Sequence, residues 1–302
     1  MDQFKRVSLS DRTVLEKMIL SLEPCSCEMN FFNIFTWEHA YDTHWGVIDG
    51  FPVIWFRNVD IILFPGGKNP EKDPPVTFLK ELIGKMHQAG FPVFLNQVPA
   101  DYLQRHPEYQ EYFHARQVAD EYGEYIHQVE KLIALKGRKL GKKKNLISQF
   151  RRLYPDYEVK PYSADQIPLC RELARKWSSV HERNLSELHE ENALSRCFEA
   201  SDPLGVEGIC LYAGGELAAF SLWTRLNSDC CDEHYEKANP EFKGSAQVVN
   251  YETMCAMNRN YQYVNREQDL GMEGLRHSKN SYAPDMILRN WDLILKEGTA
   301  AR

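Results

Sequence analysis

The order of the predicted elements constrains the fold of this chain more than any other feature, because the same order occurs twice. In the first half, a capped helix beginning at Ser10 precedes an apolar strand, and an Asp49-Gly50 turn joins that strand to two more. A helix over residues 77–90 and an apolar strand over 91–98 follow. The first half therefore predicts a helix, a hairpin, a strand, a second helix and a last strand.

The second half repeats this order. A capped helix begins at Ser163, and a hairpin around Gly214-Gly215 leads to a strand over residues 229–237. A helix over 246–258 and a strand over 261–269 complete the set. The duplication predicts an α+β protein of two similar halves, with mixed central sheets flanked by helices.

Composition places the chain among ordinary globular proteins. Its 302 residues are 43% hydrophobic and 26% charged, which suits a protein of about two domains. No apolar run approaches the roughly 18 residues of a membrane span, and the N-terminus has no signal core, so we expect a cytoplasmic protein without a transmembrane segment. The eight cysteines lack a CxxC pair, which predicts reduced thiols, and we expect no metal site.

Positive charge gathers in one segment of an acidic chain. Residues 131–152 contain nine basic side chains and no acidic ones, although the whole chain has a net charge of −7. Such a segment attracts phosphates on RNA, on a nucleotide cofactor or on a lipid headgroup, or it is simply a solvated helix face. Apolar positions from Leu146 to Leu153 predict a basic loop that leads into a helix over 142–153. The candidate phosphate-binding residues are Arg138, Lys139, Lys142, Lys143 and Arg151.

The strand over 261–269 carries ionisable residues where a core strand should be apolar. Period-two alternation predicts that Asn265, Glu267 and Asp269 share one face. Adjacent buried carboxylates need cations or water, so the pattern favours a cleft for proton transfer or cation binding. An ion-pair network at the end of a sheet would give the same pattern.

A helix is expected directly after this strand. Gly271 frees the backbone, and the helix begins near Met272 with Arg276 and Lys279 three residues apart on one face. These two cations are candidates for binding a phosphate or carboxylate group of a substrate. Tyr282, which follows the helix, is a candidate proton donor.

The strand over 229–237 supplies a second group of candidates. Simple alternation assigns its charged side chains to two faces, with Asp232, His234 and Glu236 on one and Glu233, Tyr235 and Lys237 on the other. Histidine titrates near neutral pH, which makes His234 a candidate general base, although a lone histidine in a strand is often structural.

Three segments together resemble a known family. They are residues 136–145, residues 233–244 and residues 264–282, which reads VNREQDLGMEGLRHSKNSY. They are similar to a bacterial family related to the C-terminal domain of phosphatidylglycerol lysyltransferase, and more distantly to the Fem-type aminoacyltransferases of peptidoglycan synthesis. The resemblance covers nearly the whole chain and implies two tandem GNAT-like domains, the acyl-CoA N-acyltransferase fold. We expect an N-terminal domain over 1–135, a basic connecting loop and helix over 136–154, and a C-terminal domain over 155–302.

The resemblance also implies a phosphate loop. GNAT domains bind the cofactor pyrophosphate on a loop patterned Gln/Arg-x-x-Gly-x-Gly/Ala, and this chain has Glu241, Gly244, Ser245 and Ala246 there. Glu241 departs from the pattern, because a carboxylate repels a pyrophosphate. The amides near Gly244 are nevertheless candidates for binding a phosphate or an oxyanion.

The resemblance and these residues predict a transferase that moves an acyl or aminoacyl group to an amine or hydroxyl by direct attack. The donor is aminoacyl-tRNA, bound through residues 131–152, or acyl-CoA, and the acceptor is a small molecule, a peptide or a lipid headgroup. The alternative is a non-catalytic RNA-binding or regulatory module on the same fold. The candidate catalytic residues are Glu267, Asp269, His234 and Tyr282, and the candidate substrate-binding residues are Asn265, Arg266, Arg276, Lys279 and Lys237.

Overall fold

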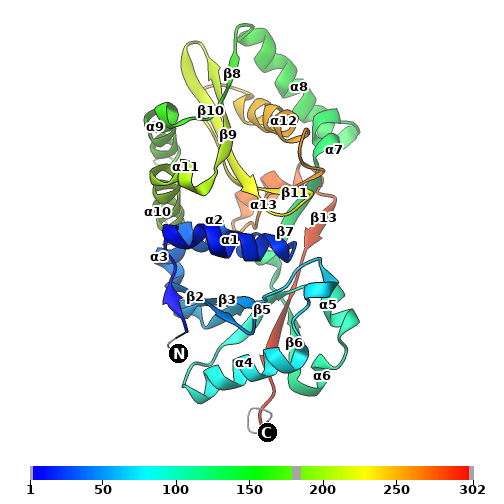
Figure 1. Ribbon diagram of the computed structural model, residues 1–302. Coiled ribbons are helices and arrows are strands. Elements are labelled where there is room, and N and C mark those ends of the chain that lie inside the picture. Colours follow the sequence, from blue (N-terminus) through cyan, green and yellow to red (C-terminus); the bar gives the residue numbers. More distant parts are fainter. Residues whose placement is uncertain (1–2, 179–184, 299–302) are drawn as a thin grey trace. The chain divides into compact units, whose positions relative to one another are not determined.

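The computed structural model describes residues 3–178 and 185–298, and the chain folds into two compact units (Figure 1). Unit 1 contains the chain up to Gly123 and from Leu288 onward, and unit 2 contains Glu124–Ile287. These bounds differ from the expected boundaries after residues 135 and 154, because the basic segment folds into unit 2 and the last strand returns to unit 1. Within the described ranges, every helix is too short or too polar to span a bilayer.

Unit 1 is built on a seven-stranded sheet in the order β1-β2-β3-β4-β5-β14-β6. Neighbouring strands are antiparallel except for the parallel pair β4 and β5. The strands are β1 (Lys5–Arg6), β2 (Thr43–Ile48), β3 (Phe51–Phe56), β4 (Ile61–Leu63), β5 (Phe94–Val98), β6 (Phe113–Gln117) and β14 (Trp291–Leu295). The α-helices are α1 (Arg12–Ser21), α2 (Phe31–Thr36), α3 (Glu38–Tyr41), α4 (Val76–Gln88), α5 (Ala100–Arg105) and α6 (Tyr109–Tyr112).

Unit 2 contains a second seven-stranded sheet, in the order β13-β7-β12-β11-β10-β9-β8. Its parallel pair is β11 and β12. The strands are β7 (Glu124–Gln128), β8 (Glu158–Pro161), β9 (Glu207–Ala213), β10 (Glu216–Arg225), β11 (Cys230–Ala238), β12 (Tyr263–Asn265) and β13 (Met286–Leu288). The α-helices are α7 (Val129–Ala134), α8 (Arg138–Leu153), α9 (Ile167–Ser178), α10 (Leu185–Glu199), α11 (Ser201–Leu204), α12 (Ser245–Met257) and α13 (Glu273–Asn280).

The two sheets have the same topology. Read from β1 in unit 1 and from β8 in unit 2, each sheet has four strands in chain order, then a parallel fifth strand, then a sixth and a seventh. The sixth strand is exchanged between the halves, since β14 completes the first sheet and β7 completes the second. The predicted duplication of two similar α+β halves is therefore confirmed, and the exchange explains why the units do not follow the expected domain boundaries.

The turns and caps of both halves follow local residue chemistry. Asp49 and Gly50 have φ values of 50° and 86°, and Gly214 and Gly215 have φ values of 60° and 84°. Positive φ at both central residues is the geometry of a tight hairpin turn, as the sequence predicts. Ser163 forms the expected capping box ahead of α9, whereas the box ahead of α1 is formed by Ser8 and not by Ser10.

Helices cover both faces of the second sheet (Figure 1). On one face, Val248 and Val249 of α12 pack in a buried cluster with Leu211 of β9. The neighbouring residue Cys210 points the other way, and its Sγ lies 3.8 Å from the Sγ of Cys170 on α9. Because alternate residues of a strand point to opposite faces, α9 lies on the face opposite α12. We call these the α12 face and the α9 face of the second sheet.

Candidate active site

The parallel strands of unit 2 separate shortly after they meet. β11 pairs with β12 at only three positions, which end at Asp232 and Asn265. β12 ends there, whereas β11 continues to Ala238. The backbone groups of β11 beyond this fork are no longer covered by β12. The side chains beside it are therefore placed to meet a substrate.

A β-bulge on β11 decides which side chains reach each face. Leu222 pairs with Tyr235 and the next residue, Trp223, pairs with Glu233, so His234 is an extra residue in β11. A bulge places two consecutive side chains on nearly the same side of the sheet. The expected simple alternation is therefore wrong. The α9 face receives Asp232, His234, Tyr235 and Lys237, and the α12 face receives Glu233 and Glu236.

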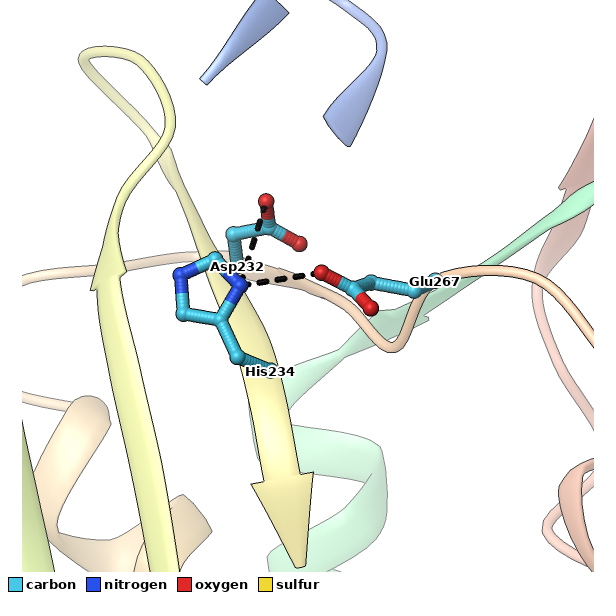
Figure 2. A group of neighbouring side chains, drawn as sticks. All are labelled: Asp232, His234 and Glu267. Carbon is cyan, nitrogen blue, oxygen red and sulfur yellow. Dashed lines mark hydrogen bonds and ion pairs between the residues drawn. The ribbon is translucent and has the colours of Figure 1, made fainter. Parts of the chain in front are cut away.

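On the α9 face, Asp232, His234 and Glu267 form a compact acid–base cluster (Figure 2). Nδ1 of His234 lies 2.9 Å from Oε1 of Glu267 and 3.9 Å from Oδ2 of Asp232. Nε2 of the same ring lies 2.8 Å from Oγ1 of Thr224. The side chains of Asp232 and His234 are enclosed, and Glu267 is 25% exposed. Glu267 is therefore the member of the cluster that faces solvent.

The same cluster is the set of described residues best arranged to hold a cation. One ligand atom from each of its three side chains lies within 4.8 Å of the others. Carboxylate and imidazole ligands suit a divalent metal. The geometry also suits proton transfer without any metal, because Nδ1 of His234 faces two carboxylates and lies within hydrogen-bond distance of Glu267.

The backbone holds Glu267 in an unusual conformation. Its φ is +56°, which interrupts the strand that the sequence predicts over 261–269. Oδ1 of the buried Asn265 accepts a hydrogen bond from the Glu267 amide at 2.8 Å, and Asn265 donates through Nδ2 to Glu124 on β7. Left-handed backbone at a non-glycine residue persists where surrounding contacts enforce it. Asn265 is thus a positioning residue for Glu267.

Asp269 does not join this cluster. Both of its carboxylate oxygens accept hydrogen bonds from Arg276 at 2.9 Å, and the Tyr125 hydroxyl donates to Oδ2 at 2.7 Å. Burial opposes ionisation of Asp269, but the bonds from Arg276 and Tyr125 outweigh it and lower the pKa of Asp269. Lys279 also turns toward this loop and donates to the carbonyl of Gln268. Arg276 and Lys279 therefore hold the loop that carries Glu267, as in the ion-pair alternative. The helix that carries them starts at Glu273, as expected.

The α12 face carries a second ionic cluster. Arg266 reaches from the end of β12 to β11, where it donates to Glu233 at 2.6 Å and to Glu236 at 3.1 Å. Its guanidinium also lies 5.1 Å from the ring centroid of Tyr282, and Nζ of Lys143 lies 4.2 Å from the same centroid. Burial, opposed by Arg266, raises the pKa of Glu236 to about 7. Arg266 and Tyr282 thus lie across the sheet from Glu267.

The predicted phosphate loop is covered by α8. Gly244 has φ +93°, and a Cβ built on it would lie 2.9 Å from the Leu146 carbonyl oxygen. The amide of Ser245 donates to Phe242, and the amides of Gln247 and Val248 both donate to Gly244. Ala246 lies in the same helical turn. The first turn of α12 therefore packs against α8, on the face away from Glu267.

The expected basic loop before residue 142 is instead the first turn of a longer helix. α8 begins at Arg138, directly after Gly137, so Arg138, Lys139 and Lys142 are all helical and exposed. Lys143 alone of the predicted set turns inward to Tyr282, and Arg151 pairs with Glu252 at 3.1 Å. Burial and the charge of Arg266 lower the pKa of Lys143.

Several residues beside the cluster were missed from the sequence. Glu124 and Thr224 come from strands that read as ordinary apolar β-structure, and no local pattern marks them. A clearer signal exists for Asn265. The equivalent strand of unit 1 has Asn96, which pairs with Leu63 as Asn265 pairs with Asp232, and which donates to Asp292 at 2.7 Å. An asparagine bound to a carboxylate on the exchanged strand is thus repeated in both halves.

Comparisons with other proteins agree on a family and a fold. A sequence-family model described as "Phosphatidylglycerol lysyltransferase, C-terminal" matches residues 21–292. An uncharacterized protein of Mycoplasmoides gallisepticum, MYCGA3080, is 24% identical over 172 residues, which are 55% of this chain and 54% of that protein. The match thus spans about half the length of that relative.

Solved structures extend the likeness to nearly the full chain. A conserved protein of unknown function from Bacteroides thetaiotaomicron is 30% identical, with a TM-score of 0.88 over 97% of this chain and 99% of that one. A domain described as the C-terminal part of a lysylphosphatidylglycerol synthetase from Agrobacterium fabrum has a TM-score of 0.64 at 14% identity, covering 97% and 94%. FemX has a TM-score of 0.61 at 9% identity, covering 97% of each chain. The last two share the fold, and the predicted tandem architecture of two similar α+β domains with mixed sheets is confirmed.

Proposed function

This chain belongs to the phosphatidylglycerol lysyltransferase C-terminal family, and on that premise we propose that it transfers an aminoacyl or acyl group to an amine or hydroxyl acceptor. The observation that carries the proposal is the cluster of Asp232, His234 and Glu267 beside the fork of β11 and β12. The equivalent strand of unit 1, β4, is wholly apolar and is followed by the buried Phe64. The chemistry is therefore assigned to unit 2.

The reaction needs one proton acceptor next to the nucleophile. The nitrogen or oxygen of the acceptor attacks the carbonyl carbon of the donor and forms a new amide or ester bond. The bond from that carbon to the carrier oxygen or sulfur then breaks, and the carrier leaves with a proton. Glu267, the exposed member, accepts the proton of the nucleophile. His234 holds Glu267 in place and, with Asp232 behind it, stabilises the change in charge.

The same arrangement favours aminoacyl-tRNA over acyl-CoA as the donor. α8 packs against Gly244. This helix therefore occupies the side of α12 where the loop pattern would place a pyrophosphate. Arg266 spans β12 and β11 through Glu233 and Glu236, so the α12 side of the fork is filled by an ion pair. The exposed cations of α8 attract a phosphate backbone. The family description supports a lysyl group as cargo and a lipid headgroup as one class of acceptor.

A transfer assay tests the catalytic assignment. Labelled amino acid on tRNA and labelled acetyl-CoA are each offered with a panel of amine and hydroxyl acceptors, and Glu267→Gln is compared with wild type. We expect Glu267→Gln to lower turnover by about 10²- to 10⁴-fold, which is the usual contribution of a general base to the reaction rate. Glu273→Gln, an exposed change of the same charge on α13, is the matched control. Wild-type turnover in Glu267→Gln would show that this carboxylate is not the base.

A salt series tests the donor. We expect tRNA affinity to fall steeply with ionic strength, and Lys139→Gln and Lys142→Gln each to reduce the slope by about one. Acetyl-CoA is expected not to raise the melting temperature. Binding of coenzyme A with no salt-dependent tRNA binding would reverse the choice of donor. Tight tRNA binding without transfer to any acceptor would favour the non-catalytic RNA-binding module.

A further inference from the structure

A small charged cavity lies on the α9 face near the acid–base cluster. It has a volume of about 240 Å³, is open to solvent, and is lined by residues of α9, α10 and the end of β11. The cavity is smaller than the roughly 300–1,000 Å³ of sites for drug-sized ligands, so it suits a small molecule.

Charges of both signs line this cavity. Arg171 and Arg175 lie four residues apart on α9 and present one helical face to it, and Lys237 enters from β11. Glu190 and Glu191 enter from α10. A ligand with only one charge leaves part of this lining unmatched, whereas a ligand with both charges matches it.

Part of the lining is fixed and part is available to a ligand. Lys237, which is 7% exposed, donates to Glu190 at 2.6 Å, and Arg171 donates to the hydroxyl of Ser195 at 2.9 Å. These contacts form a rigid floor. Arg175 and Glu191 have no ion pair with any described residue and remain to bind an anion and an ammonium group, respectively.

One strand, β11, contributes both to the cavity and to the acid–base cluster. Lys237 follows His234 by three residues on the same face, a span of about 10 Å at roughly 3.3 Å per residue. Tyr235 lies between them. Burial raises the pKa of Tyr235 well above its ordinary value, and the charges of Glu190 and Glu267 add to the shift. One hydroxyl therefore lies within electrostatic range of both Glu190 in the cavity and Glu267 in the cluster.

From this geometry we propose that the cavity binds a small zwitterion, with one carboxylate or phosphate and one ammonium group, and that this zwitterion is part of the acceptor. The anion contacts Arg175 and Arg171, and the ammonium group contacts Glu190 and Glu191. An extended chain then carries the nucleophile along β11 toward Glu267. The binding claim stands on the cavity alone, and the acceptor claim rests on the proposed function.

Binding is tested without any reaction. L-lysine and phosphoethanolamine are titrated into the full chain by calorimetry, with acetate and n-butylamine as probes that carry a single charge. We expect at least one zwitterion to bind and to raise the melting temperature with concentration, and the single-charge probes not to do so. L-lysine binding alone identifies the anion as a carboxylate, and phosphoethanolamine binding alone identifies it as a phosphate. Failure of both zwitterions to bind at millimolar concentration overturns the inference.

Variants locate the binding. Arg175→Gln and Glu191→Gln each remove one available charge, and we expect each to weaken binding about tenfold or more. Arg259→Gln, an exposed change of the same charge elsewhere in unit 2, should bind as wild type. Unchanged binding in both cavity variants overturns the inference.

Separate measurements distinguish this inference from the proposed function. Glu267→Gln should still bind the zwitterion, because Glu267 does not line the cavity. Zwitterion binding without any transfer reaction refutes the function and the acceptor role but leaves the cavity assigned. Conversely, normal transfer with an unchanged acceptor KM in Arg175→Gln and Glu191→Gln refutes the acceptor role and leaves the function intact.

Discussion

Replacing His127 with leucine should remove an acid-sensitive weakness of unit 2. His127 lies on β7, is 1% exposed, and neither ring nitrogen has a hydrogen-bond partner among the described residues. Burial, together with the charge of Arg266, lowers the pKa of His127 to about 3. The ring is therefore neutral in the folded protein across the ordinary pH range, because burial and Arg266 outweigh the favourable charge of Asp285.

The sign of the effect follows from proton linkage. An unfolded histidine titrates near pH 6.5, so between pH 6.5 and pH 3 the unfolded chain binds a proton at His127 that the folded chain does not. The free energy of unfolding therefore falls as the pH falls through this window. At about 1.36 kcal/mol per pH unit, His127 alone costs about 2 kcal/mol between pH 6.5 and pH 5.

The assay compares the acid loss of the wild type with that of His127→Leu. Urea unfolding is measured at pH 7 and pH 5, and we expect the variant to lose about 2 kcal/mol less than wild type between them. At pH 7 the variant should be no less stable, because leucine has no buried nitrogen without a partner. His277→Asn removes an exposed histidine in the same unit and serves as the control. Equal acid losses in His127→Leu and wild type would refute the reasoning.

Two further changes test the loops around the site. Gly244→Ala places a Cβ 2.9 Å from the Leu146 carbonyl oxygen at φ +93° and should cost about 1–3 kcal/mol, read as a lower melting temperature. Gly141 is the fourth residue of α8 and has nothing within 4 Å of an added Cβ, so Gly141→Ala should instead gain up to about 1 kcal/mol. A loss of similar size in both variants would contradict the packing argument. Asp269→Asn removes the carboxylate that Arg276 holds at both oxygens and should cost about 1–2 kcal/mol, because Arg276 is 44% exposed. Hydrogen exchange should show faster opening of the amides near Gly271, and unchanged exchange there would show that the ion pair does not hold this loop.

Features that depend on local chemistry were predictable from the sequence. Positive φ at Asp49-Gly50 and Gly214-Gly215 follows directly from residues that tolerate it, so both hairpins were identified. The capping box of Ser163 is equally local. The repeated order of elements then gave the two similar halves, because the order depends only on these local signals.

Features that depend on long-range pairing were not predictable. Nothing in β7 or β14 marks either strand for exchange, since each is an ordinary short strand whose partner lies far away in the sequence. The bulge at His234 has the same origin, because it is defined by the pairing of β11 with β10. A one-residue shift reverses the face of every later side chain. For this reason the sequence identified the correct strand but grouped His234 with Glu236 instead of with Tyr235.

The two sheets have the same topology, but the acid–base cluster lies in the second sheet. Asn96 and Asn265 occupy equivalent positions, and each donates a hydrogen bond to a carboxylate on the exchanged strand. This contact is therefore part of the fold that both units share. What differs is the strand beside it. β4 reads Ile-Ile-Leu and ends at the fork, whereas β11 runs past the fork with a bulge and carries Asp232 and His234. β4 buries only apolar side chains, whereas burying Asp232 and His234 on β11 costs desolvation free energy. A purely structural strand would avoid that cost, which favours a functional role for these residues. Unit 1 therefore keeps the architecture, and unit 2 adds the groups that can move a proton.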